Sequence, residues 1–330
     1  MNTIINQCVK FVSKGKAELR KEELQYVKLE GTKILGKTLV SLISSGSEAG
    51  GYMADFKPEQ YPMETGYAAI LEVLEVGDQV TTVAVGDKVF ASAPHSLYNI
   101  VDVSDTVLML EGMEPEEAVL CRFPAISMTS MLKTGIRPIE PVLVTGLGIV
   151  GLMCAQMLQH CGYPVYAVDP GANRREIAQE CGIRHVYEKV QDIPVKGNIG
   201  LAVECSGAEQ ATLSALEVLR KGGELSLVGV PWYRGTDTFA HELLQKIFYG
   251  FVTITSGWEW SIPKHPIDFI PASNYGNFAV CMQWIKDGDL KVKGIYELAD
   301  PRNCDAAYQS ILSKTTSKTC IIYDWRNLEL

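Results

Sequence analysis

The sequence has no excess of basic residues. Its 30 lysines and arginines stand against 39 aspartates and glutamates, a formal net charge of −9 over 330 residues. A protein whose main partner is a nucleic-acid backbone needs a basic face, so this balance argues against such a partner. No stretch approaches the roughly 18 consecutive apolar residues that span a membrane. The N-terminal segment MNTIINQCVKFVSKGKAELRKEE lacks the apolar core and small-residue cleavage site of a secretory signal. We therefore expect a soluble cytoplasmic protein without membrane insertion.

Cysteine pairs of the C-x-x-C type are also missing. The nine cysteines are scattered through apolar segments, and their number is odd. This usage is typical of reduced thiols packed as small hydrophobic residues, and it gives no indication of a zinc ribbon. With 47% hydrophobic and 21% charged residues, the composition is that of a packed globular protein. The length suggests about two domains.

The apolar pattern changes along the chain. In the first 120 residues, segments such as GKTLVSLISSGSE and TGYAAILEVLEVG alternate or run apolar between glycine turns, which predicts a barrel-like β domain. From Pro141 onward, short apolar strands alternate with helical segments, among them AEQATLSALEVLRKGG, followed by the strand ELSLVGV. This alternation predicts right-handed crossovers and a parallel sheet. The closing KTCIIYDW has strand character, and we expect it to return to the β domain.

The segment PVLVTGLGIVGLMCAQM contains the pattern G-x-G-x-x-G between a buried strand and an apolar helix. Gly146 suits the tight turn, Gly148 lets the backbone approach a pyrophosphate, and Gly151 lets the helix pack close to the strand. The helix N-terminus offers free N–H groups to the phosphates. A second strand ends in Asp169, 21 positions after Gly148 (169 − 148), where a carboxylate can bind both ribose hydroxyls. The alternative is a glycine-rich turn without a ligand.

Asp169 also bears on the choice of cofactor. A carboxylate at this position repels a 2′-phosphate, so the pattern favours NAD(H) over NADP. Arg174 and Arg175 follow about five residues later and are within reach of a phosphate in principle. The alternative is that they begin a solvated helix, with one of them stacking on the adenine.

With these motifs in place, the chain resembles the medium-chain dehydrogenase/reductase (alcohol dehydrogenase-like) superfamily over nearly all of its length. The motifs follow in family order as GYAAILEVLEVGDQVTTVAVGDKVF, PVLVTGLGIVGL, AVDPGANRREIAQECG, ECSGAEQATLSALEVLRKGGELSLVGV and SKTCIIYDW. The resemblance implies an α/β protein with a GroES-like β domain over 1–121 and 272–330. It implies a Rossmann domain with a doubly wound parallel sheet over 122–271. It further implies cofactor contacts at Ile149, Val150, Arg174, Cys205, Ser206, Gly207, Val228, Gly229, Val230 and Lys318.

Many members of this superfamily hold a catalytic zinc, and this sequence departs from each ligand position. Ser45 stands where the first cysteine would be, and Tyr67 and Ala68 replace the histidine and glutamate. Arg122 stands at the third position, beside Cys121. Neutral hydroxyls are poor zinc ligands and an arginine repels a cation, so we expect no zinc. The four-cysteine structural lobe is missing as well.

The ISSGSE turn, the GY pair and the final DW are most similar to a zinc-free branch of the superfamily that includes bacteriochlorophyllide a dehydrogenase. That branch oxidises a secondary alcohol on a large ring. The resemblance does not extend to the identity of the substrate.

Without zinc, other groups must manage one proton and the charge that develops on the substrate oxygen. Tyr67 is the first candidate for the proton, with Ser45 and Ser47 as a relay and Glu48 as the residue that orients them. Arg122 is a candidate for stabilising an oxyanion or for binding an acidic substrate. The alternatives are an aromatic wall for Tyr67, a structural partner of the turn for Glu48 and a structural cation for Arg122.

Other polar and aromatic residues leave more than one interpretation open. His95 lies in a loop, where it either faces the cleft or is a surface or structural histidine. The aromatic residues near the ends of the Rossmann strands suit a sugar face or a flat ring, or they pack between subunits; they are Trp232, Tyr233, Trp258 and Trp260.

The leading functional hypothesis is an NAD-dependent, zinc-independent oxidoreductase. It would interconvert a secondary alcohol and a ketone on a sugar, polyol or cyclic substrate, as a homo-oligomer, most simply a dimer. The alternatives are an enone or quinone reductase of the same superfamily and a nucleotide-binding protein without catalysis.

Overall fold

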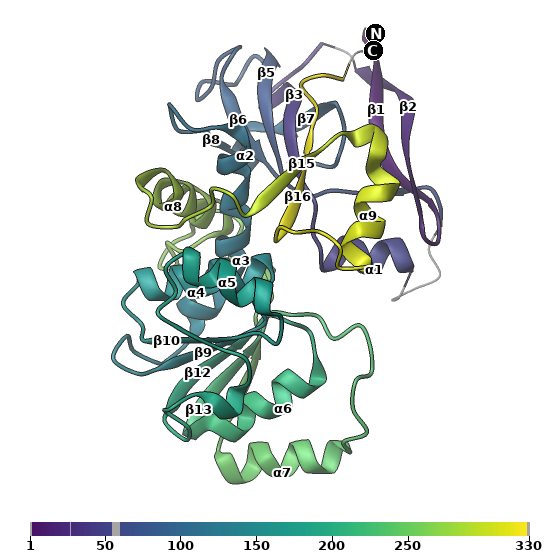
Figure 1. The fold of residues 1–330 in the computed structure, drawn as a ribbon. Coiled ribbons are helices and arrows are strands. Elements are labelled where there is room, and N and C mark those ends of the chain that lie inside the picture. Colours follow the sequence, from purple (N-terminus) through teal and green to yellow (C-terminus); the bar gives the residue numbers. More distant parts are fainter. Residues whose placement is uncertain (1, 27, 55–59, 329–330) are drawn as a thin grey trace. The chain divides into compact units, whose positions relative to one another are not determined.

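The computed structural model describes residues 2–26, 28–54 and 60–328, and the chain divides into two compact units (Figure 1). Unit 1 is drawn from residues 1–122, 278–286 and 292–330, and unit 2 from residues 123–277 and 287–291. Unit 2 therefore extends six residues beyond the predicted boundary at 271. It also includes residues 287–291, which lie within the range predicted for the GroES-like domain.

Two β-sheets build unit 1. A three-stranded sheet has the order β2 (Lys16–Tyr26), β1 (Asn2–Ser13), β4 (Met63–Glu64). A seven-stranded sheet follows the path β15 (Tyr296–Ala299), β16 (Cys320–Asp324), β3 (Lys33–Leu42), β5 (Ala69–Val76), β6 (Lys88–Ala91), β8 (Thr106–Leu108), with β7 (Tyr98–Asp102) paired to β3. Because β16 pairs antiparallel with β3, the C-terminal segment joins the sheet that the N-terminal part begins.

Helices and an aromatic cluster pack on these sheets. The helices that contribute to unit 1 are α1 (Ser47–Met53), α2 (Pro115–Ala118), α9 (Cys304–Leu312) and most of α8 (Asn274–Asp287). The rings of Phe11 and Tyr308 meet edge to face at 4.9 Å, and Tyr52 stacks on Tyr308 at 5.3 Å. Aromatic pairs of this kind stabilise a core by about 0.5–1.5 kcal/mol beyond the area that they bury. This cluster fixes α1 and α9 beside the sheet.

Unit 2 contains a six-stranded, all-parallel sheet. Its order is β11 (His185–Tyr187), β10 (Val165–Val168), β9 (Val142–Thr145), β12 (Ile199–Glu204), β13 (Leu219–Leu227), β14 (Thr253–Ser256). The helices are α3 (Arg122–Lys133, from Phe123 on), α4 (Ile149–His160), α5 (Ala172–Glu180), α6 (Glu209–Val218) and α7 (Ala240–Gly250). The strand order reverses between β9 and β12, and ligands of such sheets bind at the carboxyl ends of the strands at this point.

Two local predictions differ from the structure. The helix expected over residues 208–223 ends at Val218, and β13 begins at Leu219 instead of at Glu224. Pairing with β12 overrides the helical pattern, since Leu219 pairs with Ile199 before a bulge. The segment AHELLQKIFYG, for which the sequence analysis assigned no element, forms α7. Within the described part of the chain, no helix combines the length and the apolar character that membrane crossing requires.

Candidate active site

The glycine-rich loop of unit 2 connects β9 to α4 in a conformation that requires glycine. Gly146 has a φ of +83°, and a Cβ there would lie 2.6 Å from the Cβ of Ser206. A Cβ on Gly151 would lie 1.7 Å from the carbonyl oxygen of Gly146, so only glycine lets the helix come this close to the loop. A Cβ on Gly148, in contrast, would have no atom of the described structure within 4 Å, its own chain neighbours aside. Two glycines are thus required by packing, and the third faces open space.

Asp169 lies directly after β10 and is 2% exposed. Its Oδ2 accepts the N–H of Leu147 at 2.7 Å, and its Oδ1 accepts the N–H of Gly171 at 2.7 Å. The carboxylate therefore holds the glycine loop. Arg174 Nη1 lies 3.5 Å from Oδ2. Arg175 donates to the backbone carbonyls of Asp169 and Pro170. Both arginines are thus engaged with this corner of the sheet.

The loop after β12 is held by Glu204, a residue that the sequence analysis did not single out. Its carboxylate accepts N–H bonds from Ser206 at 2.7 Å and from Gly207 at 3.0 Å, and also the Ser206 hydroxyl. Burial raises the pKa of the Glu204 carboxyl, and this effect outweighs the hydrogen bonds from these donors, which lower it. The pKa of the Cys205 thiol is raised by the adjacent Cys154 thiol and by burial. Cys205 is therefore a protonated packing residue rather than a nucleophile.

The loops after β12 and β13 meet at glycine. A Cβ on Gly207 would lie 2.4 Å from the carbonyl oxygen of Val230, and one on Gly229 would lie 2.2 Å from the N of Gly207. The N–H groups of Val228 and Gly229 both donate to the Glu204 carbonyl oxygen at 2.8 Å. Five predicted cofactor residues are therefore brought together at the carboxyl ends of two neighbouring strands; they are Ser206, Gly207, Val228, Gly229 and Val230.

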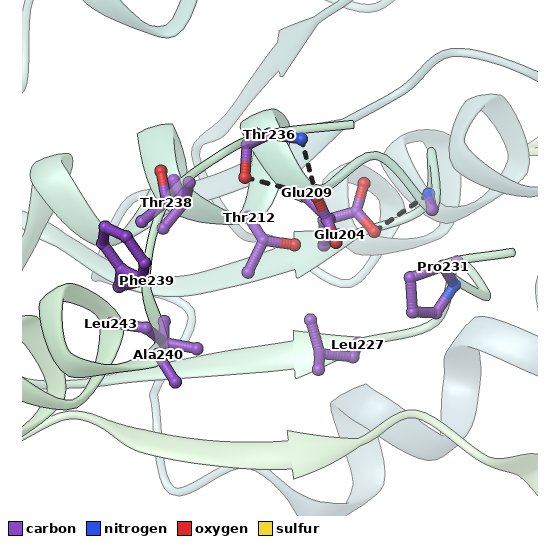
Figure 2. Close-up of a pocket in the computed structure, with 13 residues that line it drawn as sticks. Glu204, Glu209, Thr212, Leu227, Pro231, Thr236, Thr238, Phe239, Ala240 and Leu243 are labelled. Atoms are coloured by element: carbon purple, nitrogen blue, oxygen red, sulfur yellow. Dashed lines mark hydrogen bonds between the residues drawn. The ribbon is translucent and has the colours of Figure 1, made fainter. Parts of the chain in front are cut away.

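A cavity of about 230 Å³ opens beside these two loops (Figure 2). Figure 2 shows Glu204 and Pro231 near one part of its wall, and Phe239, Ala240 and Leu243 near another. Glu209 Oε2 accepts the N–H groups of Gly235 and Thr236 at 2.8 Å. These bonds hold the segment around Thr236, which lines the cavity, against the start of α6.

The remaining predicted cofactor residues lie at different places. Ile149 is buried and Val150 half-buried at the N-terminus of α4. Lys318 is exposed in the segment before β16, and it belongs to unit 1 instead of unit 2.

In unit 1, Ser45 lies in the turn between β3 and α1, Ser47 is the first residue of α1, and both are exposed. The Ser47 hydroxyl donates to the Ser44 hydroxyl at 2.8 Å, and the Ser47 N–H also points to it at 3.3 Å. Ser44 therefore fixes the side chain of Ser47, while Ser45 presents its hydroxyl at the surface of the unit.

Tyr67 precedes β5, and its half-buried ring stacks on Arg122. The guanidinium carbon lies 4.6 Å from the centroid of Tyr67 and 5.1 Å from that of Phe278. Arg122 is 2% exposed, so a cation is held between two aromatic rings in a desolvated place, where cation–π attraction is strongest. The structure thus brings Tyr67 and Arg122 together, as two of the predicted catalytic residues.

Glu48 and His95 are buried in unit 1 and pair with each other. His95 Nε2 lies 3.1 Å from Glu48 Oε2, and the exposed fractions of the two side chains are 0% and 8%. The surface alternative for His95 is therefore wrong, and the structural alternative describes it. Oε1 of Glu48 accepts the backbone N–H of Ser44 at 2.9 Å. Glu48 therefore holds the turn through Ser44 and not through the side chains of Ser45 or Ser47.

The two units define a class of protein, in which a GroES-like β unit accompanies a Rossmann unit with a dinucleotide-type glycine loop. A family model described as zinc-binding dehydrogenase matches residues 150–257. In this match and in its fold, the chain is similar to the medium-chain dehydrogenase/reductase superfamily. The predicted superfamily and fold class are therefore confirmed.

Among curated relatives, D-guloside 3-dehydrogenase from Escherichia coli (strain K12) is 30% identical over 178 residues, which cover 50% of this chain and 51% of the relative. The chain thus spans about half the length of this relative. Galactitol-1-phosphate dehydrogenase from Escherichia coli has a similar structure, with a TM-score of 0.80, 14% identity and coverage of 96% and 99%. Acetophenone reductase from Geotrichum candidum NBRC 4597 in complex with NAD has a TM-score of 0.78, 14% identity and coverage of 97% and 97%. Another solved structure of this fold is bound to NADP.

Proposed function

We propose that this protein is an NAD(H)-dependent oxidoreductase that interconverts a secondary alcohol and a ketone. The observation that carries the proposal is the loop at the switch point of the parallel sheet, where Gly146 and Gly151 are required by packing and Gly148 faces open space. Similarity to the superfamily supports the same class of reaction.

The residues of the loop fit a dinucleotide. The open space at Gly148 and the N–H groups at the start of α4 suit the pyrophosphate. Asp169 Oδ1 keeps a lone pair for a ribose hydroxyl, because it accepts one backbone N–H, whereas Oδ2 also faces Arg174. Its negative charge disfavours a 2′-phosphate, which supports NAD over NADP. When bound, the nicotinamide accepts or supplies the hydride.

The superfamily implies a catalytic zinc in many members, and the residues of this chain do not fit one. Ser45 and Tyr67 offer neutral hydroxyls, which are poor zinc ligands. Arg122 stands 4.6 Å from the Tyr67 ring and brings a permanent positive charge to the place of the third ligand. The proposed reaction therefore proceeds without zinc.

In this proposal Tyr67 handles the proton of the substrate oxygen. During ketone reduction its hydroxyl donates the proton as the hydride adds to the carbonyl carbon. During alcohol oxidation its phenolate accepts the proton of the substrate hydroxyl as the hydride leaves. Arg122 stabilises the negative charge that develops on oxygen or on the phenolate. Ser45 and Ser47 pass the proton to solvent, which their exposure supports.

For the substrate we propose a sugar, polyol or cyclic secondary alcohol. The relative named D-guloside 3-dehydrogenase supports the sugar class. The aromatic residues after β13 and β14 support it as well, because aromatic rings stack on the apolar faces of sugars.

We further propose a cytoplasmic homodimer. Leu244, Phe248 and Phe251 recur at i, i+4 and i+7 along and just after α7, and they are 62%, 74% and 71% exposed. An exposed apolar stripe of this kind marks an interaction surface. All nine cysteines are free thiols in the structure, which supports a reducing compartment.

The test is a panel of sugars, polyols, cyclic alcohols, ketones, enones and quinones, assayed by the absorbance of NADH. Ketone formed from an alcohol supports the proposal, and saturation of an enone or reduction of a quinone assigns the reductase alternative instead. Binding of NADH without turnover on any compound would indicate a nucleotide-binding protein without catalysis.

A further inference from the structure

We propose that His95 and Glu48 form a buried positioning pair that fixes the two segments on which the proton step depends, Ser44–Ser47 and Thr65–Tyr67. The inference rests on the proposed function, because that function gives the two segments their part in the proton step. Its geometry lies entirely within unit 1.

Glu48 is the acceptor at one end of the pair. Its Oε2 accepts the hydroxyl of Tyr308 at 2.6 Å and faces Nε2 of His95 at 3.1 Å, and its Oε1 accepts the N–H of Ser44 at 2.9 Å. An ionised carboxylate accepts hydrogen bonds and cannot donate them. With Glu48 ionised, Nε2 of His95 is the donor in this contact.

The other ring nitrogen of His95 faces a hydroxyl group. Nδ1 lies 2.7 Å from the Ser41 hydroxyl, which itself accepts the indole N–H of Trp325 at 2.8 Å. An indole nitrogen only donates, so Ser41 keeps its own hydrogen for Nδ1. A single chain of hydrogen bonds thus runs from Trp325 through Ser41, His95 and Glu48 to Tyr308.

The hydrogen-bond network around His95 and Glu48 contacts both segments. Glu48 anchors the first through the Ser44 N–H, and Ser44 in turn accepts the Ser47 hydroxyl at 2.8 Å. On the other side, the backbone N–H of His95 donates to the Thr65 carbonyl oxygen at 2.7 Å. Gly66, at a φ of +89°, lies against the imidazole so closely that a Cβ there would be 2.7 Å from its Cγ. The residue before Tyr67 therefore rests on the ring that Glu48 holds.

The pair acts through these segments and not on substrate. The His95 side chain is fully buried, and its ring meets Tyr323 edge to face at 4.9 Å. Misplacement of a reacting group by about 1 Å can slow a reaction by about 10²-fold, so loosening the pair is expected to slow the hydride step.

Tyr308→Phe and Tyr52→Phe make a matched comparison. The two rings stack on each other at 5.3 Å, and each variant removes one hydroxyl from the same cluster. The Tyr308 hydroxyl binds Glu48, whereas the Tyr52 hydroxyl binds the Gly15 carbonyl and Asp305. We expect Tyr308→Phe to slow the single-turnover hydride step by about 10-fold and Tyr52→Phe to leave it unchanged, with the NADH Kd equal in both.

His95→Leu and His95→Gln test the histidine side of the pair. Leucine removes both polar contacts and is expected to slow the hydride step by about 10²-fold, while glutamine keeps a donor near the Nε2 position and restores most of the rate. If His95→Leu does not fold, Tyr308→Phe and His95→Gln carry the test. Equal hydride rates in Tyr308→Phe, Tyr52→Phe and the wild type would overturn the proposal.

An NMR measurement separates this proposal from the proposed function. In the full-length protein, Tyr308→Phe should shift the backbone amide signals of both Ser44–Ser47 and Gly66–Tyr67, and Tyr52→Phe should shift neither set to a similar extent. If the wild type turns over no compound, the proposed function fails, and these signals alone decide whether the pair positions the two segments. Unmoved signals in both segments would then overturn it.

Discussion

Tyr67 and Arg122 are two predicted catalytic residues whose side chains contact each other in the structure. The guanidinium lies over the phenol ring at 4.6 Å and is itself almost fully buried. A fixed cation beside the phenol stabilises a phenolate or a developing oxyanion, since charges interact more strongly away from water. In the proposed reaction, Tyr67 would supply the proton and Arg122 the compensating charge.

Tyr67→Phe isolates the hydroxyl, because it keeps the ring that Arg122 stacks on. We expect the hydride step to fall by about 10²–10⁴-fold, the range typical of general acid–base catalysis. The affinity for NADH should stay nearly unchanged, since the glycine loop lies in unit 2. Single-turnover kinetics across pH measures both quantities. A variant that retains wild-type speed at every pH would show that Tyr67 is only a wall and that Ser45, Glu48 or solvent handles the proton.

Asp169→Ala tests the cofactor preference. Removing the carboxylate deletes the proposed ribose contacts and the repulsion of a 2′-phosphate, so NADH should bind about 10-fold more weakly or worse, and the preference over NADPH should narrow. Asp169→Asn is the companion variant, because it removes the charge while keeping an oxygen for Leu147 or Gly171. Titration with both coenzymes gives the Kd values. A wild type that already prefers NADPH would contradict the carboxylate argument.

At the scale of elements, two glycines of the turn from β9 to α4 allow a packing role and a ligand-binding role to be tested separately. Gly151→Ala places a methyl group 1.7 Å from the Gly146 carbonyl oxygen, so we expect a lower Tm and loss of NADH binding together. Gly148→Ala places its methyl group in open space, at a φ of −62° that alanine adopts readily. It should leave the Tm near that of the wild type and still weaken NADH. Gly148→Ala with unchanged NADH affinity would argue against a pyrophosphate at this turn.

Helix α7 carries the proposed interface between copies of the chain. Phe248→Asp puts a charge in the middle of the exposed stripe and should convert the dimer to a monomer, which light scattering after size exclusion detects. Ile139→Asp is the matched control, since Ile139 is 88% exposed elsewhere in unit 2. A monomeric wild type, or a Phe248→Asp protein that keeps the dimer mass, would rule out this interface.

For the whole molecule, the donor set at the superfamily's metal position leads to a prediction about composition. Purified protein should contain no stoichiometric zinc, and chelators should leave its activity intact, because two hydroxyls and an arginine do not hold a zinc ion. Elemental analysis and an assay after chelation measure this. One tightly held zinc per chain would overturn the interpretation of Ser45, Tyr67 and Arg122.

The sequence by itself determined the features that depend on neighbours along the chain. The glycine spacing, the alternation of strands and helices and the position of Asp169 follow from local periodicity and from the conformations that only glycine adopts. These were enough to predict the superfamily and the fold class.

Only the tertiary structure decided what depends on residues far apart. Glu48 meets His95 across 47 positions and Tyr308 across 260, so no local pattern could show that the pair is buried. The early end of α6 has the same origin, since pairing of Leu219 with Ile199 outweighs helix propensity. The role of Glu204 also appears only in three dimensions, where loops after two separate strands converge on one carboxylate and one backbone carbonyl. Local propensity sets the elements, but burial and hydrogen-bond pairing between them set the environment of each functional group.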